Sequence, residues 1–208
     1  MKAFIYVGGD IFTDGIIEFP KGDDLKISAD CGFKNAEKLG IVPDFAVGDF
    51  DSGSMAELPR ETEIIEVPAE KDFTDTQLAL EVAIEHGADY IIIIGGLGGR
   101  LDHTISNLSL LEKLWCMGIR AIITDGKNRA RYIERTSELI PHGGFKYLSL
   151  ICADKEAKGV SVEGCKYPLK NAKLTRTNNS FTTSNEILKN CALVSVKKGG
   201  LFIIESND

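Results

Sequence analysis

Up to about residue 125, the sequence alternates between short apolar runs and longer amphipathic segments. Several runs contain almost no polar residue, and residues 90–94 read YIIII. A strand without polar alternation is typical of a parallel sheet, in which helices cover both faces. The pattern therefore predicts an α/β domain with a mostly parallel sheet. The predicted strands are Ala3–Val7, Leu25–Ala29, Phe45–Gly48, Glu63–Val67, Tyr90–Ile94 and Ala121–Thr124.

Three amphipathic segments between these strands are predicted helices: Phe33–Leu39, Thr76–His86 and Thr104–Met117. Each is followed directly by a glycine, the residue that most often terminates a helix. In the two longer segments the apolar residues recur at helical spacing and share one face, as expected for helices that pack on a sheet.

After about Gly126 the pattern changes to short apolar or alternating runs separated by Gly, Pro and Asn. Runs at hairpin spacing predict a smaller all-β, sandwich-like domain. We therefore expect an α/β domain over residues 1–126 and a β-rich domain over residues 127–208. Lys198-Gly199-Gly200 predicts a tight turn between the last two runs. The runs are Arg131–Glu134, Phe145–Cys152, Gly159–Glu163, Leu169–Leu174, Cys191–Lys197 and Leu201–Glu205.

Composition excludes several classes of function. The net charge is −7, and the basic residues are scattered, whereas a nucleic-acid surface needs a basic stripe. Five widely spaced cysteines without a Cys-x-x-Cys pair predict reduced thiols. No apolar run approaches the ~20 residues that cross a bilayer. The sequence enters a strand directly, without a cleavable signal pattern, so we expect a cytoplasmic protein.

Three short acidic segments each follow a predicted strand: residues 48–52 (GDFDS), 71–76 (KDFTDT) and 95–103 (GGLGGRLDH). In an open α/β sheet, ligands bind beyond the carboxyl ends of the strands, so these carboxylates should converge. Mg²⁺ is commonly held by one or two carboxylates together with substrate phosphates. The three segments therefore predict a metal–nucleotide site.

The first two segments supply most of the candidate metal ligands. Asp49 and Asp51 are two residues apart and can reach one cation, although the alternative is that they cap a turn. Asp72 and Asp75 precede a predicted helix, where Thr74 or Asp75 would serve as the N-cap. Capping needs one side-chain oxygen, so two carboxylates beside Lys71 exceed what a cap requires.

The third segment resembles a phosphate-binding loop. Its four glycines expose backbone N–H groups, and the following helix can direct its positive end at a phosphate. Arg100 adds donors suited to phosphate oxygens, and Asp102 adds a further acid. The alternative for Asp102 is the N-cap of that helix. His103 is more often a packing residue than a catalyst.

These motifs, in their order and spacing, resemble those of the thiamine pyrophosphokinase family. The matching segments are residues 30–32 (DCG), 43–52 (PDFAVGDFDS), 71–76 (KDFTDT), 99–103 (GRLDH) with Asn107, and 183–186 (TSNE). The resemblance implies transfer of the diphosphate of Mg-ATP to thiamine, giving thiamine diphosphate and AMP. It also implies a homodimer in which the vitamin binds between the α/β domain of one subunit and the β domain of the other.

The resemblance also implies a role for each matching residue. Asp49, Asp51 and Asp75 would gather around magnesium and the phosphates, and Asp102 would join them or orient the acceptor. Arg100 would contact the phosphate chain, and Ser184 and Asn185 would approach thiamine. Four further residues would contribute to ligand binding: Asp30, Lys71, Asp72 and Asn107.

The chain departs from the family pattern at two places. Cys31 stands where the family usually has a second glycine. Some members stack thiamine on a tryptophan just after the Ser-Asn pair, whereas here Ile187 and Leu188 follow and the one tryptophan is Trp115. We therefore expect the thiamine ring to be recognised differently in this chain.

Two other functions agree with the same residues. One is diphosphate transfer to another heterocyclic alcohol, such as a hydroxymethyl pterin, and the region from Leu174 to Glu186 should distinguish the acceptors. The other is a non-catalytic metal–nucleotide sensor. ATP consumption with AMP release in the presence of thiamine separates the sensor from both enzymes. The general base is left unassigned between Asp75 and Asp102.

Overall fold

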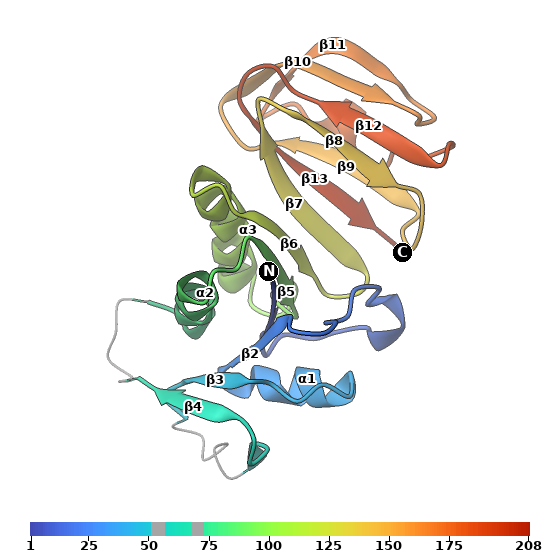
Figure 1. Ribbon diagram of the computed structural model, residues 1–208. Helices are drawn as coiled ribbons and strands as arrows, with labels where there is room; N and C mark the ends of the chain where they lie inside the picture. The colour runs from blue at the N-terminus through green and yellow to red at the C-terminus, as the bar shows by residue number, and fades with distance from the viewer. Residues whose placement is uncertain (51–56, 68–72) are drawn as a thin grey trace. The chain divides into compact units, whose positions relative to one another are not determined.

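The computed structural model describes residues 1–50, 57–67 and 73–208 (Figure 1). Three of the predicted site residues, Asp51, Lys71 and Asp72, therefore lie outside the described residues. The chain divides into two compact units, Met1–Gly126 and Lys127–Asp208.

The first unit contains a parallel sheet, as predicted. Its strands follow the order β4-β3-β2-β1-β5-β6, and the pairs from β4 to β6 are all parallel. The central strands β1 and β5 are almost fully buried because both of their faces are covered. The strands are β1 (Lys2–Tyr6), β2 (Leu25–Ala29), β3 (Phe45–Gly48), β4 (Glu63–Glu66), β5 (Tyr90–Ile94) and β6 (Arg120–Thr124).

Three α-helices follow strands of this sheet: α1 (Phe33–Lys38), α2 (Asp75–Glu85) and α3 (Leu101–Cys116). Glycines 40, 87 and 118 lie just beyond their ends with φ of 70°, 81° and 79°, the left-handed conformation that stops a helix. One face of β1 and β5 packs against α1 in a cluster that includes Phe4, Tyr6, Ala36, Ile92 and Ile94. Short 3₁₀ turns cover Thr13–Gly15 and Asp30–Gly32.

Two helix starts decide between the alternatives that the sequence left open. Thr74 is the N-cap of α2, and Thr74 and Gln77 form a reciprocal capping box. Helix α3 begins at Leu101, three residues before the predicted start, with Arg100 as its N-cap. The capping role considered for Asp102 is therefore wrong, because Asp102 lies inside the first turn. A carboxylate there is still favourable beside the positive end of the helix dipole.

The strand pairs within the second unit are all antiparallel, which agrees with the predicted β-rich fold. Strands β7, β13 and β9 are hydrogen-bonded in that order, and a separate four-stranded sheet has the order β11-β10-β12-β8. Alternate residues of β9, such as Leu148 and Leu150, are buried, as expected for a strand with one inward face. The strands are β7 (Asn128–Glu134), β8 (Ser137–Pro141), β9 (Tyr147–Cys152), β10 (Glu156–Glu163), β11 (Leu169–Thr175), β12 (Cys191–Ser195) and β13 (Gly200–Ser206), with a 3₁₀ turn at Ser180–Thr182.

Two features of this unit differ from the sequence prediction. Strand β8 was not predicted, because Ile140 is its one buried residue and it ends in a proline. The Lys198-Gly199-Gly200 link does not close a hairpin, since β12 and β13 belong to different sheets. Among the described residues, no helix has the length and apolar character needed to cross a membrane.

Candidate active site

A cavity of about 350 Å³ lies in the first unit, beyond the carboxyl ends of β1, β2 and β5. This is the edge at which open α/β sheets bind ligands. Loops after these three strands form its walls, together with the beginnings of α2 and α3. The lining residues are Val7–Gly9, Ala29–Cys31, Thr74–Thr76, Gly95, Gly96, Gly98–Arg100, His103 and Asn107.

Glycine allows two of the cavity loops to approach each other closely. A Cβ atom added to Gly9 would lie 2.2 Å from the Gly95 carbonyl oxygen, and one added to Gly95 would lie 2.5 Å from the Val7 carbonyl oxygen. Gly95 also has φ of 84°, which side chains disfavour. The loop after β1 and the loop after β5 are therefore in backbone contact, and their glycines contribute main chain to this part of the cavity wall.

Two buried asparagines tie these loops to the helices behind them. Asn35 is 3% exposed, and its side-chain Nδ2 donates to the carbonyl oxygens of Val7 and Gly9, both at 2.6 Å. Asn107 Nδ2 donates to the Gly96 carbonyl oxygen at 2.9 Å. Asn107 was a predicted binding residue, and the structure places it in the cavity wall. Asn35 was not predicted, and no local signal marks it, since an asparagine in a short helix usually faces solvent.

Arg100 and Asp102 form a two-pronged ion pair at the entrance to α3. Arg100 Nη2 and Nε lie 2.6 and 3.2 Å from the two carboxylate oxygens of Asp102. Hydrogen bonding between the two side chains is the main reason why the pKa of Asp102 is lowered and the pKa of Arg100 is raised. Both side chains are more than 60% exposed, so the pair adds little to stability. Arg100 can therefore exchange this carboxylate for a phosphate at small cost.

Asp30 and Asp75 are the carboxylates among the described residues of the cavity wall. Asp30 has φ of 47°, an unfavourable backbone conformation for a side chain other than glycine, of the kind found at functional sites. Asp75 is the first residue of α2. Oxygen ligands of this type suit Mg²⁺, so the residues present fit that ion.

Of the predicted pair Asp49 and Asp51, Asp49 lies within the described residues and Asp51 lies outside them. Asp49 follows β3, but the described residues of the cavity wall do not include it. Within residues 1–50, 57–67 and 73–208, no three His, Cys, Asp or Glu side chains are grouped to hold a metal. Because Asp51 lies outside these ranges, the shared metal site of Asp49 and Asp51 stays a prediction.

Cys31 is accommodated by the glycine opposite to it. A Cβ atom added to Gly8 would lie 2.2 Å from Cys31 Sγ, so the thiol fills the space that a side chain at position 8 would take. Burial, and next the charge of Asp30, raise the pKa of the Cys31 thiol. The residue is therefore an uncharged part of the cavity wall.

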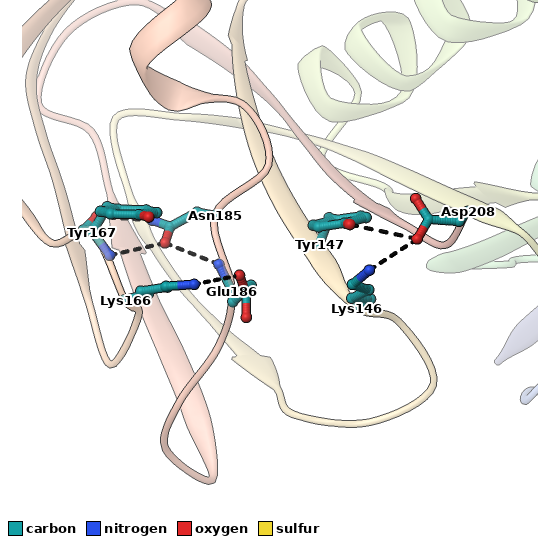
Figure 2. Close-up of polar contacts among 7 residues, drawn as sticks. All are labelled: Lys146, Tyr147, Lys166, Tyr167, Asn185, Glu186 and Asp208. Atoms are coloured by element: carbon teal, nitrogen blue, oxygen red, sulfur yellow. Dashed lines mark hydrogen bonds and ion pairs between the residues drawn. The ribbon is translucent and has the colours of Figure 1, made fainter.

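The predicted Ser184-Asn185 pair lies in the second unit, and Figure 2 shows Asn185 with its partners. Ser184 has φ of 56°, and its backbone N–H donates to Ser149 Oγ at 3.0 Å. Asn185 is buried, and its Oδ1 accepts from the backbone N–H groups of Tyr167 and Glu186 at 3.0 and 2.9 Å. Its Nδ2 donates to the Tyr167 carbonyl oxygen at 2.8 Å. The Asn185 amide therefore holds neighbouring backbone in place.

Comparison with known proteins accounts for both units. Residues 18–123 match the family described as "Thiamin pyrophosphokinase, catalytic domain", and residues 136–201 match "Thiamin pyrophosphokinase, vitamin B1 binding domain". The thiamine pyrophosphokinase of Bacillus subtilis (strain 168) is 33% identical over 196 residues, which cover 88% of each chain.

Solved structures give the same result. The crystal structure of thiamine pyrophosphokinase from Bacillus subtilis superposes with a TM-score of 0.89 over all of both chains, at 30% identity. That of thiamin pyrophosphokinase from Geobacillus thermodenitrificans gives a TM-score of 0.85 at 28% identity, covering all of this chain and 98% of the other. With both family domains matched in order, this chain belongs to the thiamine pyrophosphokinase family.

Proposed function

We propose that the chain transfers the diphosphate group of ATP to the hydroxyl oxygen of thiamine, forming thiamine diphosphate and AMP. The observation that carries this proposal is the cavity at the carboxyl ends of β1, β2 and β5, which brings two glycine loops together with Asp30, Asp75 and Arg100. A cavity of about 350 Å³ is of the size at which small-molecule and cofactor sites begin, ~300–1,000 Å³.

The phosphate chain of ATP would bind along the loop after β5. Gly98 and Gly99 both have positive φ, a conformation in which successive N–H groups can converge on an anion. Helix α3, 16 residues long, begins directly after this loop and adds the positive end of its dipole. Arg100 would turn from Asp102 to a phosphate and keep a charge-assisted, two-pronged hydrogen bond.

Magnesium would be held by Asp49, Asp51 and Asp75, with Asp30, Lys71 and Asp72 near the nucleotide. When bound, the ion supplies positive charge that neutralises the phosphate oxygens. Asp30 and Asp75 of the cavity wall support this assignment, because they bring carboxylates to the same cavity as the glycine loops.

In the reaction, the thiamine hydroxyl oxygen forms a bond to the β-phosphorus of ATP. The bond from that phosphorus to the oxygen that bridges the α- and β-phosphates breaks, and AMP leaves with the bridging oxygen. The protein contributes mainly position and charge, since a loose transition state needs little help in deprotonating the alcohol. If a general base takes part, it would be Asp75 or Asp102.

Thiamine would be bound by the second unit, through the region around Ser184 and Asn185. The match of residues 136–201 to a vitamin B1 binding domain supports this. We further propose a homodimer in which each site takes residues from both subunits, as the family resemblance implies. The thiazolium cation is favoured by the net charge of −7.

The test is an assay of AMP release with ATP, Mg²⁺ and thiamine, with thiamine diphosphate identified by mass. We expect AMP and thiamine diphosphate in equal amounts, no AMP without thiamine, and loss of activity with a chelator that restored Mg²⁺ reverses. Equal rates with a hydroxymethyl pterin would assign another acceptor. Nucleotide binding without AMP release under any of these conditions would identify a sensor.

A further inference from the structure

The loop after β5 is held by side chains from one face of helix α3. Thr104 and Asn107 are three residues apart, so they lie on the same side of the helix. Thr104 Oγ1 donates to the Gly98 carbonyl oxygen at 3.1 Å, and Asn107 Nδ2 donates to the Gly96 carbonyl oxygen at 2.9 Å. Two carbonyl groups of the glycine loop are therefore turned toward α3 and bound by it.

The bond to Gly98 is the distinctive contribution of the Thr104 hydroxyl. A hydroxyl carries one hydrogen, and the Arg100 carbonyl oxygen lies farther from Oγ1, at 3.4 Å. That carbonyl already accepts the Thr104 backbone N–H at 3.1 Å, in the usual helical pattern. Removing the hydroxyl would therefore leave the helical bond intact and release the Gly98 carbonyl.

The peptide between Gly98 and Gly99 can rotate with little steric resistance. Both residues have positive φ, of 81° and 65°, and a Cβ atom added to either would meet nothing within 4 Å. Glycine moves between left-handed and right-handed backbone conformations without the penalty that a side chain imposes. Because packing does not fix this peptide, a hydrogen bond to its carbonyl can decide its orientation.

The orientation of this peptide determines which polar group it presents. In a trans peptide the C=O and the following N–H point to opposite sides. With the Gly98 carbonyl bound by Thr104, the Gly99 N–H therefore points away from that hydroxyl. Within the described residues the Gly99 N–H has no hydrogen-bond partner, and both glycines line the cavity. A rotated peptide would instead present a carbonyl oxygen, which repels an anion.

We infer that Thr104 is a positioning residue for the phosphate chain, because it fixes the Gly98–Gly99 peptide with its N–H available to a phosphate oxygen. The inference rests on the proposed function, in which the nucleotide binds along this loop. Donors that are oriented before the ligand arrives stabilise its charge without a cost of reorganisation. A fixed peptide also spares the ligand the entropic cost of ordering it. Thr104 acts through the loop and is not required to touch the nucleotide.

Four variants isolate the hydroxyl. Thr104→Val removes it with little change of shape, because a methyl group takes its place, and Thr104→Ser restores it without the methyl group. Ser109→Ala is the matched control on the same helix, since the exposed Ser109 Oγ also donates to a carbonyl oxygen, that of Ser106 at 2.6 Å. Thr104→Ala lacks the hydroxyl as well, and it replaces Thr104→Val if the latter does not fold.

The experiment measures Kd for ATP and for adenosine by calorimetry, and KM for ATP and for thiamine in the AMP-release assay. Loss of one hydrogen bond should weaken ATP binding about 3- to 10-fold in Thr104→Val. Binding of adenosine, which has no phosphate, should be unchanged, and so should KM for thiamine. Thr104→Ser and Ser109→Ala should bind ATP as the wild type does.

Three results would overturn the inference. Thr104→Val could bind ATP as tightly as the wild type, or Thr104→Ser could be impaired as strongly as Thr104→Val. An equal loss of adenosine and ATP binding in Thr104→Val would show that the substitution damages the whole cavity rather than the phosphate contact. A wild-type protein that forms no AMP with thiamine refutes the proposed function, whereas an active wild type with normal ATP binding in Thr104→Val refutes this inference alone.

Discussion

Replacing Asn35 with alanine should loosen the cavity loop that follows β1. The side chain supplies both hydrogen bonds to the Val7 and Gly9 carbonyl oxygens, each at 2.6 Å. Val7 and Gly9 are both half-buried, so water limits the loss to about 0.5–1.5 kcal/mol for each carbonyl. The free energy of unfolding should fall by about 1–3 kcal/mol. We also expect KM for ATP to rise, with a smaller change in KM for thiamine.

Asn35→Asp gives a sharper form of the same test. Aspartate matches asparagine in size and keeps an acceptor for Lys38 Nζ, which lies 3.0 Å from Asn35 Oδ1. It loses the two N–H donors of Nδ2 and places a carboxylate oxygen next to the Val7 and Gly9 carbonyl oxygens, which repel it. Asn35→Asp should therefore be no more stable than Asn35→Ala, although it is the smaller change in shape.

Urea denaturation and steady-state kinetics measure both effects. Asn190→Asp, at an exposed position, is the control and should change stability by less than about 0.5 kcal/mol. If Asn35→Asp unfolds like wild type and uses ATP normally, the amide does not hold the loop and the reasoning is refuted.

Four further outcomes are expected. Arg100→Lys loses the planar fork and should raise KM for ATP about 10- to 100-fold, whereas the exposed Arg120→Lys should leave it unchanged. Asp51→Asn should cut turnover by about 10²–10³ with wild-type folding by circular dichroism, and normal turnover would remove Asp51 from the metal site. In Arg100→Ala, carboxyl-carbon NMR should show the Asp102 pKa rising toward its ordinary value, with the His103 N–H still lowering it in part. Because the folded-state pKa is depressed, the contribution of the pair is present at neutral pH and is lost as the pH falls below the ordinary value and through the depressed one. Mixing Asp51→Asn with Asn185→Ala subunits should restore up to about a quarter of wild-type activity, and exchange verified by mass without recovery would place each site within one chain.

Features of the fold that depend on local sequence were predictable. Ile91–Ile94 are at most 1% exposed, as the unbroken apolar run indicated, because a central parallel strand has no solvent-facing side. The helix ends at Gly40, Gly87 and Gly118 were equally clear, since glycine adopts positive φ without strain.

The start of α3 was not predictable in the same way. The sequence predicts a helix that begins near Thr104, with Asp102 as the N-cap candidate. In the structure the Thr104 hydroxyl donates to the carbonyl oxygens of Gly98 and Arg100, at 3.1 and 3.4 Å, from within the first turn. A threonine hydroxyl can bind either a preceding carbonyl or a following N–H, so a threonine by itself does not fix where a helix begins. The same ambiguity applied to Asp102.

Local sequence patterns also do not decide which sheet a strand of the second unit joins. Two strands separated by a short glycine-containing link usually form a hairpin. Here β12 pairs with β10 and β8, whereas β13 pairs with β7 and β9. The choice of partner is set by contacts such as that of Leu201 with Ile133 and Cys152, which are distant in sequence.

The cavity shows most clearly which part of a site a sequence reveals. Carboxylates and arginine are visible as motifs because their chemistry is specific to their residue type. Part of the wall, however, is main chain from glycine loops. These loops are held by Asn35 and Asn107, whose amides bind carbonyl oxygens 26–28 and 11 residues away. Nothing in the local sequence distinguishes such an asparagine from a surface one. If phosphate binding depends on this backbone, then substitutions at the two asparagines should impair ATP use, as substitutions in the loops themselves would.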